Sequence, residues 1–395
     1  MKPIHCLLLV CIVAGLAACS SASSNTNPDQ AAFVTLLGQD TLAVEVFEHT
    51  PQGMEATVVL RTPRTTVQRY RLNLGAEGAF QHMETEIREP GSPGNADLLV
   101  EETYVIEGDS LKVTVTKNGQ TETRAIAGHG QMLPFLDMIH WPFDLMLMRA
   151  HASGQDSVTQ DLFTGRGSLP FVVRRTSEGA MTATHPFRGT MAVDVDDEGR
   201  LLKLDAGATT RKLIVTRVPA SEVDIEAIAA RFAAADAAGM PFGALSGRGE
   251  TTAQVSGATI TVDYGRPAKR GREIFGALVP WGEVWRTGAN QATHFTTNRT
   301  LKLGDLTVPA GTYTLFTIPE PGGGTLIVNR QTGQGGTTYN EDRDLGRVPM
   351  TARELPEPVE LFTIAVEETG GGGELQLLWD RTALVVPFTV QGQGL

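Results

Sequence analysis

The residues best suited to chemistry gather in one short segment, VPWGEVWRTGANQATHFTT, at positions 279–297. It holds Trp281, Trp285, Arg286, Asn290 and His294. A guanidinium is a planar fork of donors that suits a carboxylate or a phosphate, an indole face can stack on a sugar ring, and an imidazole can move a proton. The segment therefore offers groups for binding an anion or a sugar, and one group for acid–base chemistry.

Each of these five residues also has a structural interpretation. Trp281 and Trp285 can cover a sheet edge, and Arg286 can hold the following turn through bonds to carbonyl groups. Asn290 can hold a turn by bonding nearby backbone, and a lone His294 can simply pack in a strand. Both interpretations stay open from the sequence alone.

A second candidate site lies just upstream, where basic residues cluster in an acidic chain. The chain has 33 basic and 45 acidic residues and a net charge of −12. The cluster consists of Arg266, Lys269, Arg270 and Arg272. It is either a solvated loop or an anion pocket, which Arg286 would join if the fold brings it near. The overall charge argues against a nucleic-acid partner, because phosphate backbones need a cationic face.

Motifs for established catalytic or metal chemistry are missing from the sequence. It has no G-x-S-x-G nucleophile elbow, no H-E-x-x-H, no P-loop and no dinucleotide fingerprint. The run from Asp194 to Gly199 loosely resembles a calcium loop, but strand patterns on both sides favour a hairpin turn. We expect no metal site and no cofactor.

The chain begins with the features of a secretory signal peptide. Lys2 precedes an apolar run from Cys6 to Leu16. As a helix, this run spans about 16 Å, whereas a bilayer core of about 30 Å requires more. Cys6 and Cys11 lie inside the segment that a signal peptidase would remove, so the mature chain can form no disulfide.

The residues that end this segment, Leu16-Ala17-Ala18-Cys19, resemble the bacterial lipobox. The resemblance implies a signal peptide over 1–18, acylation of Cys19 by chains such as palmitate, and a membrane as partner. Ser20 in place of Asp implies sorting to an outer membrane, on its periplasmic face. Residues 19–32 are small and polar, which is typical of a flexible tether.

Residues 33–218 predict an antiparallel β-domain. Strand patterns with a period of two recur with short connections, and Asn118-Gly119 predicts a type I′ hairpin turn. The exception is 132–150, MLPFLDMIHWPFDLMLMRA, which is apolar on almost every side. We expect a broken or double helix there, interrupted at Pro142 and buried as a plug inside a curved sheet. It could also line a cleft for an acyl chain.

Residues 219–250 predict a linker helix and a loop. The helix spans 221–239, with Ser221 as its cap and Gly239 at its end. From 251 to 395, many short strand patterns alternate with Gly-rich turns, which indicates a β-sandwich. The expected fold is mostly β: a curved sheet around a helical plug, a linker helix and a sandwich.

Several motifs in the last segment resemble a bacterial family known as domain of unknown function 2911. They are Tyr264-Gly265-Arg266-Pro267, Gly271–Gly276 (GREIFG), Val279–Asn290 (VPWGEVWRTGAN), Pro309–Tyr313 (PAGTY) and Leu315–Pro319 (LFTIP). The resemblance implies a secreted or envelope-attached β-domain. It brings no activity and no site residue.

Three functions remain from the sequence. The first is a lipid-anchored envelope protein with a non-catalytic binding or structural role, whose ligand would be a small anion or a sugar. Its candidate ligand-binding residues are Arg266, Arg272, Trp281, Trp285, Arg286, Asn290 and His294. The second is an envelope hydrolase of a glycan, peptide or lipid, with His294 and an acid such as Asp342. The third is a lipid carrier or chaperone that uses the concave first sheet.

Overall fold

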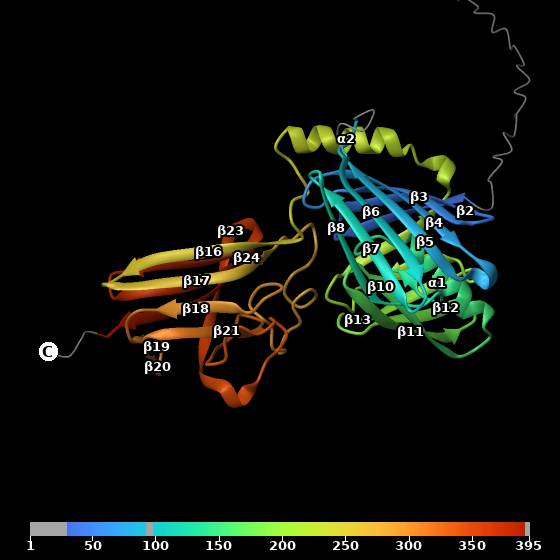
Figure 1. Ribbon diagram of the computed structural model, residues 1–395. Coiled ribbons are helices and arrows are strands. Elements are labelled where there is room, and N and C mark those ends of the chain that lie inside the picture. The colour runs from blue at the N-terminus through green and yellow to red at the C-terminus, as the bar shows by residue number, and fades with distance from the viewer. Residues whose placement is uncertain (1–29, 92–97, 392–395) are drawn as a thin grey trace, which may run out of the picture.

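The computed structural model describes residues 30–91 and 98–391, and Figure 1 shows their arrangement. Cys19 and the expected signal peptide lie outside the described residues. The described chain is mostly β and forms two sheets, with two α-helices (Figure 1). This confirms the fold class predicted from the sequence.

The first sheet has fifteen strands in the order β8-β7-β6-β5-β4-β3-β2-β1-β15-β14-β13-β12-β11-β10-β9. Consecutive strands from β1 to β8 and from β10 to β15 pair antiparallel, and the short β9 runs parallel to its neighbour β10. β1 pairs with both β2 and β15, which joins the start of this region to its end. The strands are β1 (Gln30–Leu37), β2 (Asp40–Thr50), β3 (Gly53–Leu60), β4 (Thr66–Leu74), β5 (Phe80–Arg88), β6 (Leu98–Glu107), β7 (Ser110–Lys117), β8 (Gln120–Ala127), β9 (Leu133–Pro134), β10 (Ser157–Thr164), β11 (Gly167–Ser177), β12 (Ala180–His185), β13 (Gly189–Val195), β14 (Leu201–Asp205) and β15 (Leu213–Val218).

The turn between β7 and β8 has the predicted geometry. Asn118 and Gly119 have φ of 52° and 73°, and Lys117 faces Gln120 in the register. A two-residue turn with positive φ at both positions is the type I′ hairpin that Asn-Gly favours.

At the start of the first sheet, β1 begins at Gln30, three residues before the expected start of the β-domain at residue 33.

The first sheet curls until its two halves meet. Phe163 on β10 packs against Phe80 on β5 and Tyr104 on β6, with ring centroids 4.8 Å and 5.4 Å away. Near the edge, Arg124 on β8 donates to the carbonyl of Gly165, after β10. The curled sheet encloses one continuous hydrophobic core.

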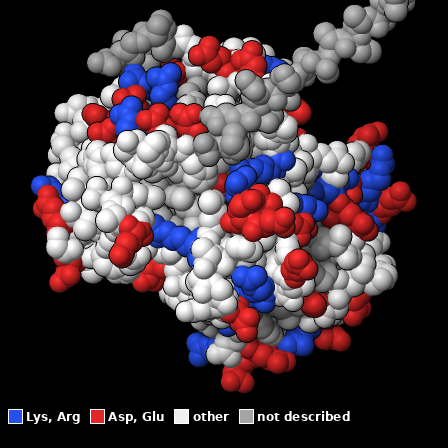
Figure 2. All heavy atoms as spheres, turned by 90° about the vertical axis from the view of Figure 1, so that its right-hand side faces the viewer, with Lys and Arg blue, Asp and Glu red and all other residues white. Residues whose placement is uncertain are grey.

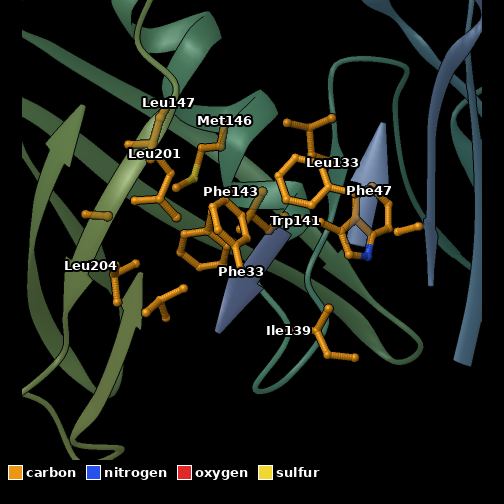
Figure 3. Close-up of a cluster of buried hydrophobic side chains, with 14 of the residues drawn as sticks. Phe33, Phe47, Leu133, Ile139, Trp141, Phe143, Met146, Leu147, Leu201 and Leu204 are labelled. Carbon is orange, nitrogen blue, oxygen red and sulfur yellow. The ribbon is translucent and has the colours of Figure 1, made fainter. Parts of the chain in front are cut away.

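Helix α1 (Trp141–Ala152) fills the interior of the curled sheet. Figure 3 shows its side chains in the centre of the core, beside Phe33 and Leu201. The interior is therefore packed core. The expected break at Pro142 was wrong: Pro142 lies in the first turn, where the missing N–H costs nothing because that group has no partner within the helix. The buried side chains of the helix include Trp141, Phe143, Met146 and Leu147.

Buried charges connect α1 to the surrounding strands. Glu45 on β2 is fully buried, and its carboxylate accepts hydrogen bonds from the N–H groups of His140 and Trp141 at the start of the helix. Asp144 is also fully buried and accepts from the N–H of Leu201 and from the guanidinium of Arg217. Burying charges is favourable only where such partners compensate for the lost water.

Helix α2 (Ile225–Ala237) lies over the outside of the first sheet (Figure 1). Its Ala229 and Phe232 pack against Val59 of β3. The cap is Asp224, whose carboxylate accepts from the N–H of Ala227, so the expected Ser221 cap was wrong. Ser221 instead lies in a separate 3-10 turn, η3 (Ala220–Glu222), because the chain turns before the helix begins.

The second sheet has nine strands in the order β16-β17-β18-β21-β22-β23-β24-β19-β20 and folds over itself as a sandwich with its own core. The hydroxyl of Thr251 on β16 donates to the carbonyl of Ile364 on the distant β23, which joins the two layers. The strands are β16 (Ser246–Val255), β17 (Ala258–Pro267), β18 (Thr293–Thr297), β19 (Leu301–Leu303), β20 (Leu306–Val308), β21 (Gly311–Glu320), β22 (Gly323–Asn329), β23 (Asp344–Thr369) and β24 (Gly372–Val390).

Arg270 fastens the second sheet to the first. Its carbonyl accepts from the N–H of Gln39 at 3.0 Å, and its guanidinium pairs with Asp40 at 2.9 Å. The same guanidinium lies 3.7 Å from the ring centroid of Phe242. Gly38 is needed here, because it has φ of 65° and a Cβ would lie 2.3 Å from the carbonyl oxygen of Arg270. These contacts fix how the two sheets meet.

The outer face of the first-sheet region carries acidic and basic side chains in mixture (Figure 2). Over residues 30–91 and 98–391, the helices are too short or too polar to cross a membrane.

Candidate functional site

A cleft of about 540 Å³ lies where the two sheets meet, and we call it the inter-sheet cleft. Residues from both sheets line it, and five of them are basic. None of the described lining residues is Asp or Glu, although the chain has 45 acidic residues against 33 basic ones. Such a one-sided set of charges creates a positive potential that attracts anions. The basic lining residues are Arg188, Arg211, Lys212, Arg272 and Arg286.

Two of the five cations already have a carboxylate partner. Arg188 and Arg211 both pair with Asp137, which lies in the loop before α1. Burial by itself raises the pKa of Asp137, but its bonds to the two arginines outweigh burial and hold the pKa below its ordinary value. Asp137 is therefore ionised at neutral pH and offsets part of the charge of this pair.

The other three cations, Lys212, Arg272 and Arg286, form what we call the cation triad. Lys212 donates to the carbonyl of Gly207, and Arg272 donates to two backbone carbonyls. The Arg286 guanidinium has no hydrogen-bond or ion-pair partner in the described part of the chain. None of the three forms a salt bridge with a described carboxylate. Their positive charge is available to a ligand.

Burial disfavours the charged form of all three cations of the triad, and Lys212 is also affected by the charges of the other two. Burial lowers the pKa of Lys212, and the positive charges of Arg272 and Arg286 lower it further. Burial also lowers the pKa of Arg272 and of Arg286. Partly buried like charges disfavour each other, so an anion bound among them would relieve this repulsion.

Two segments that carry the triad have unusual backbone conformations. Lys212 has φ of 58°, and Thr287, next to Arg286, has φ of 50°. Positive φ is rare for residues other than glycine, and for a β-branched Thr it is strained. Thr287 is fully buried; its hydroxyl bonds that of Thr317 at 2.6 Å, and its carbonyl accepts from Thr293. Strain kept in place by surrounding structure is concentrated at functional sites.

Close packing holds the loop of Arg286 in position. A Cβ at Gly265 would lie 2.0 Å from the carbonyl oxygen of Ala289, and a Cβ at Gly336 would lie 2.8 Å from Cδ of Arg286. Trp285 stacks on Trp379, with centroids 5.9 Å apart. A side chain held by such packing meets its ligand with little loss of entropy.

Four of the seven ligand-binding candidates from the sequence line the inter-sheet cleft: Arg272, Trp285, Arg286 and Asn290. The other three are placed elsewhere. Arg266 bonds the carbonyl of Phe362 and the hydroxyl of Thr363. Trp281 is 41% exposed and stacks on Phe275. His294 accepts from the N–H of Gly333 at its Nε2.

Arg188, Arg211 and Lys212 were missed from the sequence. They come from turns of the first sheet, and only the meeting of the two sheets brings them to Arg272 and Arg286. Arg211 and Lys212 lie just before β15, which begins at Leu213. In the sequence, the signal for Arg211 and Lys212 is that they are two adjacent basic residues between strand patterns. Of the upstream basic cluster, Arg272 alone lines the cleft, and Arg270 serves the contact between sheets.

The acid–base pair considered for a hydrolase is not assembled in the described residues. Asp342 lies in η4 (Glu341–Arg343), and no described hydrogen bond or ion pair joins it to His294. The nearby Tyr339 lines the cleft and donates to Asp344, which also pairs with Arg347. The structure describes no group of three or more His, Cys, Asp or Glu residues that could hold a metal ion.

The calcium-like run from Asp194 onward is the turn that was predicted. The carboxylate of Asp196 accepts from the N–H groups of Glu198 and Arg200, which closes the connection between β13 and β14.

Comparison with known proteins finds a family match for the second sheet. Residues 246–388 match the family described as "Protein of unknown function (DUF2911)". This match supports the resemblance seen in the sequence. It also includes β16, which lies before the first of the resembling motifs. The match covers the C-terminal region, including Arg272, Arg286 and Asn290, and does not reach the first sheet.

One solved structure similar to the chain is the "Crystal Structure of Beta-barrel-like Protein of Domain of Unknown Function DUF1849 from Brucella abortus". It shares 14% sequence identity, with a TM-score of 0.32, and the similarity covers 48% of this chain and 94% of that one. No curated protein matches the chain.

Proposed function

We propose that this protein is a non-catalytic binding protein that holds a small anionic ligand in the inter-sheet cleft. The observation that carries the proposal is the cation triad of Lys212, Arg272 and Arg286. It is partly buried, it has no carboxylate partner among the described residues, and it belongs to an acidic chain. Evolution tolerates unpaired, mutually repelling charges mainly where function needs them.

The lining of the cleft suits an anion with an apolar or ring-shaped part. Two guanidinium groups can each bind a phosphate or carboxylate through two donors, and an ammonium adds a point charge. Trp285, Phe316 and Tyr339 provide aromatic walls. The volume of about 540 Å³ falls within the range of small-molecule sites.

The proposal is tested by thermal unfolding of the protein in increasing inorganic phosphate at constant ionic strength, because a ligand that binds the folded state alone raises Tm. We expect saturable stabilisation of the natural protein and none of Arg286→Gln. The matched control is Arg353→Gln, which removes an exposed arginine of the second sheet that pairs with Glu374. Equal stabilisation of all three proteins, or of none, contradicts the proposal.

The structure favours neither alternative function. In the hydrolase hypothesis His294 is the base, yet its Nε2 already accepts from Gly333. In the carrier hypothesis the concave sheet holds lipid, yet α1 and its core residues fill that space. The cleft offers the better-supported site.

We also propose that Cys19 is acylated and holds the protein at the envelope, on the periplasmic face of an outer membrane. The resemblance of Leu16–Cys19 to the lipobox supports this localisation. Several acyl chains anchor a protein stably, whereas one does so weakly. Labelled palmitate should enter the protein and should not enter Cys19→Ser; equal labelling of both contradicts the assignment.

A further inference from the structure

A second cavity opens beside the inter-sheet cleft, inside the end of the first sheet. It measures about 40 Å³, and we call it the aromatic pocket. It shares Arg188, Thr209 and Arg211 with the cleft, so the two spaces adjoin along one wall. Its wall is mainly apolar and includes Phe135, Phe143, Phe171, His185, Met191 and Leu213.

The polar side chains on this wall are the Asp137 carboxylate, which pairs with Arg188 and Arg211, and the imidazoles of His140 and His185. The side chain of His185 is buried with 6% exposure, and burial followed by the charge of Arg188 lowers its pKa to about 4. The ring is therefore neutral at pH 7. Its Nδ1 accepts from the N–H of Phe187, so the proton lies on Nε2.

The Nε2–H of His185 has no hydrogen-bond partner in the described chain. An unpaired buried donor is costly and calls for an explanation. A ligand oxygen in the pocket would pair it. The residue thus points to a group that is mainly apolar and carries one acceptor.

Polarity changes in steps from the cleft to the pocket. Among the described residues the cation triad has no carboxylate partner, and at the shared wall Asp137 offsets part of the charge of Arg188 and Arg211. Beyond them, the pocket is lined by neutral rings and aliphatic side chains. A molecule that is charged at one end and apolar at the other matches this sequence of environments.

We propose, on the basis of the anion site proposed above, that the ligand is an amphipathic anion. Its phosphate or carboxylate group lies at Lys212, Arg272 and Arg286, and a short apolar group with one oxygen acceptor enters the aromatic pocket beside His185. The small volume of the pocket restricts this group to a few carbon atoms and excludes a long acyl chain.

The test compares the affinities of inorganic phosphate and n-butyl phosphate for the full chain by titration calorimetry. Butyl phosphate should bind at least tenfold more tightly, because the removal of two methylene groups from water already gives about a factor of ten. Ala206→Leu fills the pocket from its buried wall, so it should keep the affinity for phosphate and lose the butyl advantage. Met191→Phe fills the same pocket from β13 and serves if Ala206→Leu fails to fold.

The donor of His185 is tested by butyl phosphate against 2-methoxyethyl phosphate, which carries an ether oxygen in a chain of similar length. The ether should gain affinity relative to butyl in the natural protein, and His185→Phe should abolish that gain.

The outcomes separate the two proposals. If phosphate binds through Arg286 and butyl phosphate binds no more tightly, the anion site stands and the amphipathic ligand is wrong. A butyl advantage that survives in both pocket-filling variants also overturns it, because the apolar group then lies elsewhere. If neither compound binds, both proposals fail.

Discussion

Glu45 is expected to be the main polar anchor of the helix inside the first sheet. It is fully buried, and its carboxylate accepts from the N–H of His140 at 2.9 and 3.0 Å and from the N–H of Trp141 at 2.9 Å. These N–H groups belong to the start of α1, where no carbonyl within the helix can reach them. A carboxylate there also interacts favourably with the helix dipole.

Glu45→Ala leaves two buried N–H groups without acceptors. Each unpaired group costs about 1–3 kcal/mol, so we expect the free energy of unfolding to fall by about 2–6 kcal/mol. This loss corresponds to a decrease in Tm of roughly 2–7 °C for a protein of this size. Glu45→Gln keeps one acceptor oxygen and should lose about 1–2 kcal/mol, the difference between a charged and a neutral acceptor.

Urea unfolding followed by circular dichroism measures these changes. The matched control is Glu48→Ala, a half-exposed acid on the same strand, which should change stability by less than about 0.5 kcal/mol. If Glu45→Ala loses no more than Glu48→Ala, the carboxylate does not hold the helix and the reasoning is refuted.

Three further predictions concern the cleft and its surroundings. Gly265→Ala should weaken phosphate binding at least tenfold in calorimetry, because the new Cβ would lie 2.0 Å from the carbonyl oxygen of Ala289 and displace the loop of Arg286. The control is Gly247→Ala, which has open space around its Cβ and should bind phosphate normally. In the folded protein His185 has a pKa of about 4, below its ordinary 6.5. Its contribution to stability is therefore full above pH 6.5 and declines towards pH 4, because the unfolded state takes up the proton first. In His185→Phe, the urea concentration at the unfolding midpoint should vary less with pH over that range. The pKa of Asp137 is also lowered in the folded protein. Its contribution to stability is therefore full above its ordinary pKa of 3.8 and is lost as the pH falls through the folded value. Asp137→Asn should remove this loss of stability in acid, measured by the same urea midpoints.

Local patterns were enough to predict most of the fold. Alternating apolar residues located the strands, and Asn118-Gly119 fixed a hairpin, because both depend on neighbours in the chain. The apolar segment 132–150 was correctly predicted to be buried. Its detail was missed, since Pro142 can either break a helix or begin one, and tertiary packing decides between them.

The site was less predictable, because it depends on contacts between distant residues. Arg286 and Arg272 stood out as cations in a specific motif. Lys212 joins them only after some 200 residues of chain have folded into two sheets that meet at Arg270. Arg270 itself seemed equivalent to its basic neighbours, and the structure shows that it binds Asp40 and serves the contact between sheets.

The most direct test of the central claim is anomalous diffraction from crystals of the protein soaked in selenate, a heavy-atom analogue of sulfate and phosphate. We predict a selenium peak in the inter-sheet cleft within hydrogen-bond distance of Arg286 and of at least one of Lys212 and Arg272. The peak should be absent from Arg286→Gln crystals. An empty cleft at saturating selenate, or a peak that persists without Arg286, would contradict it.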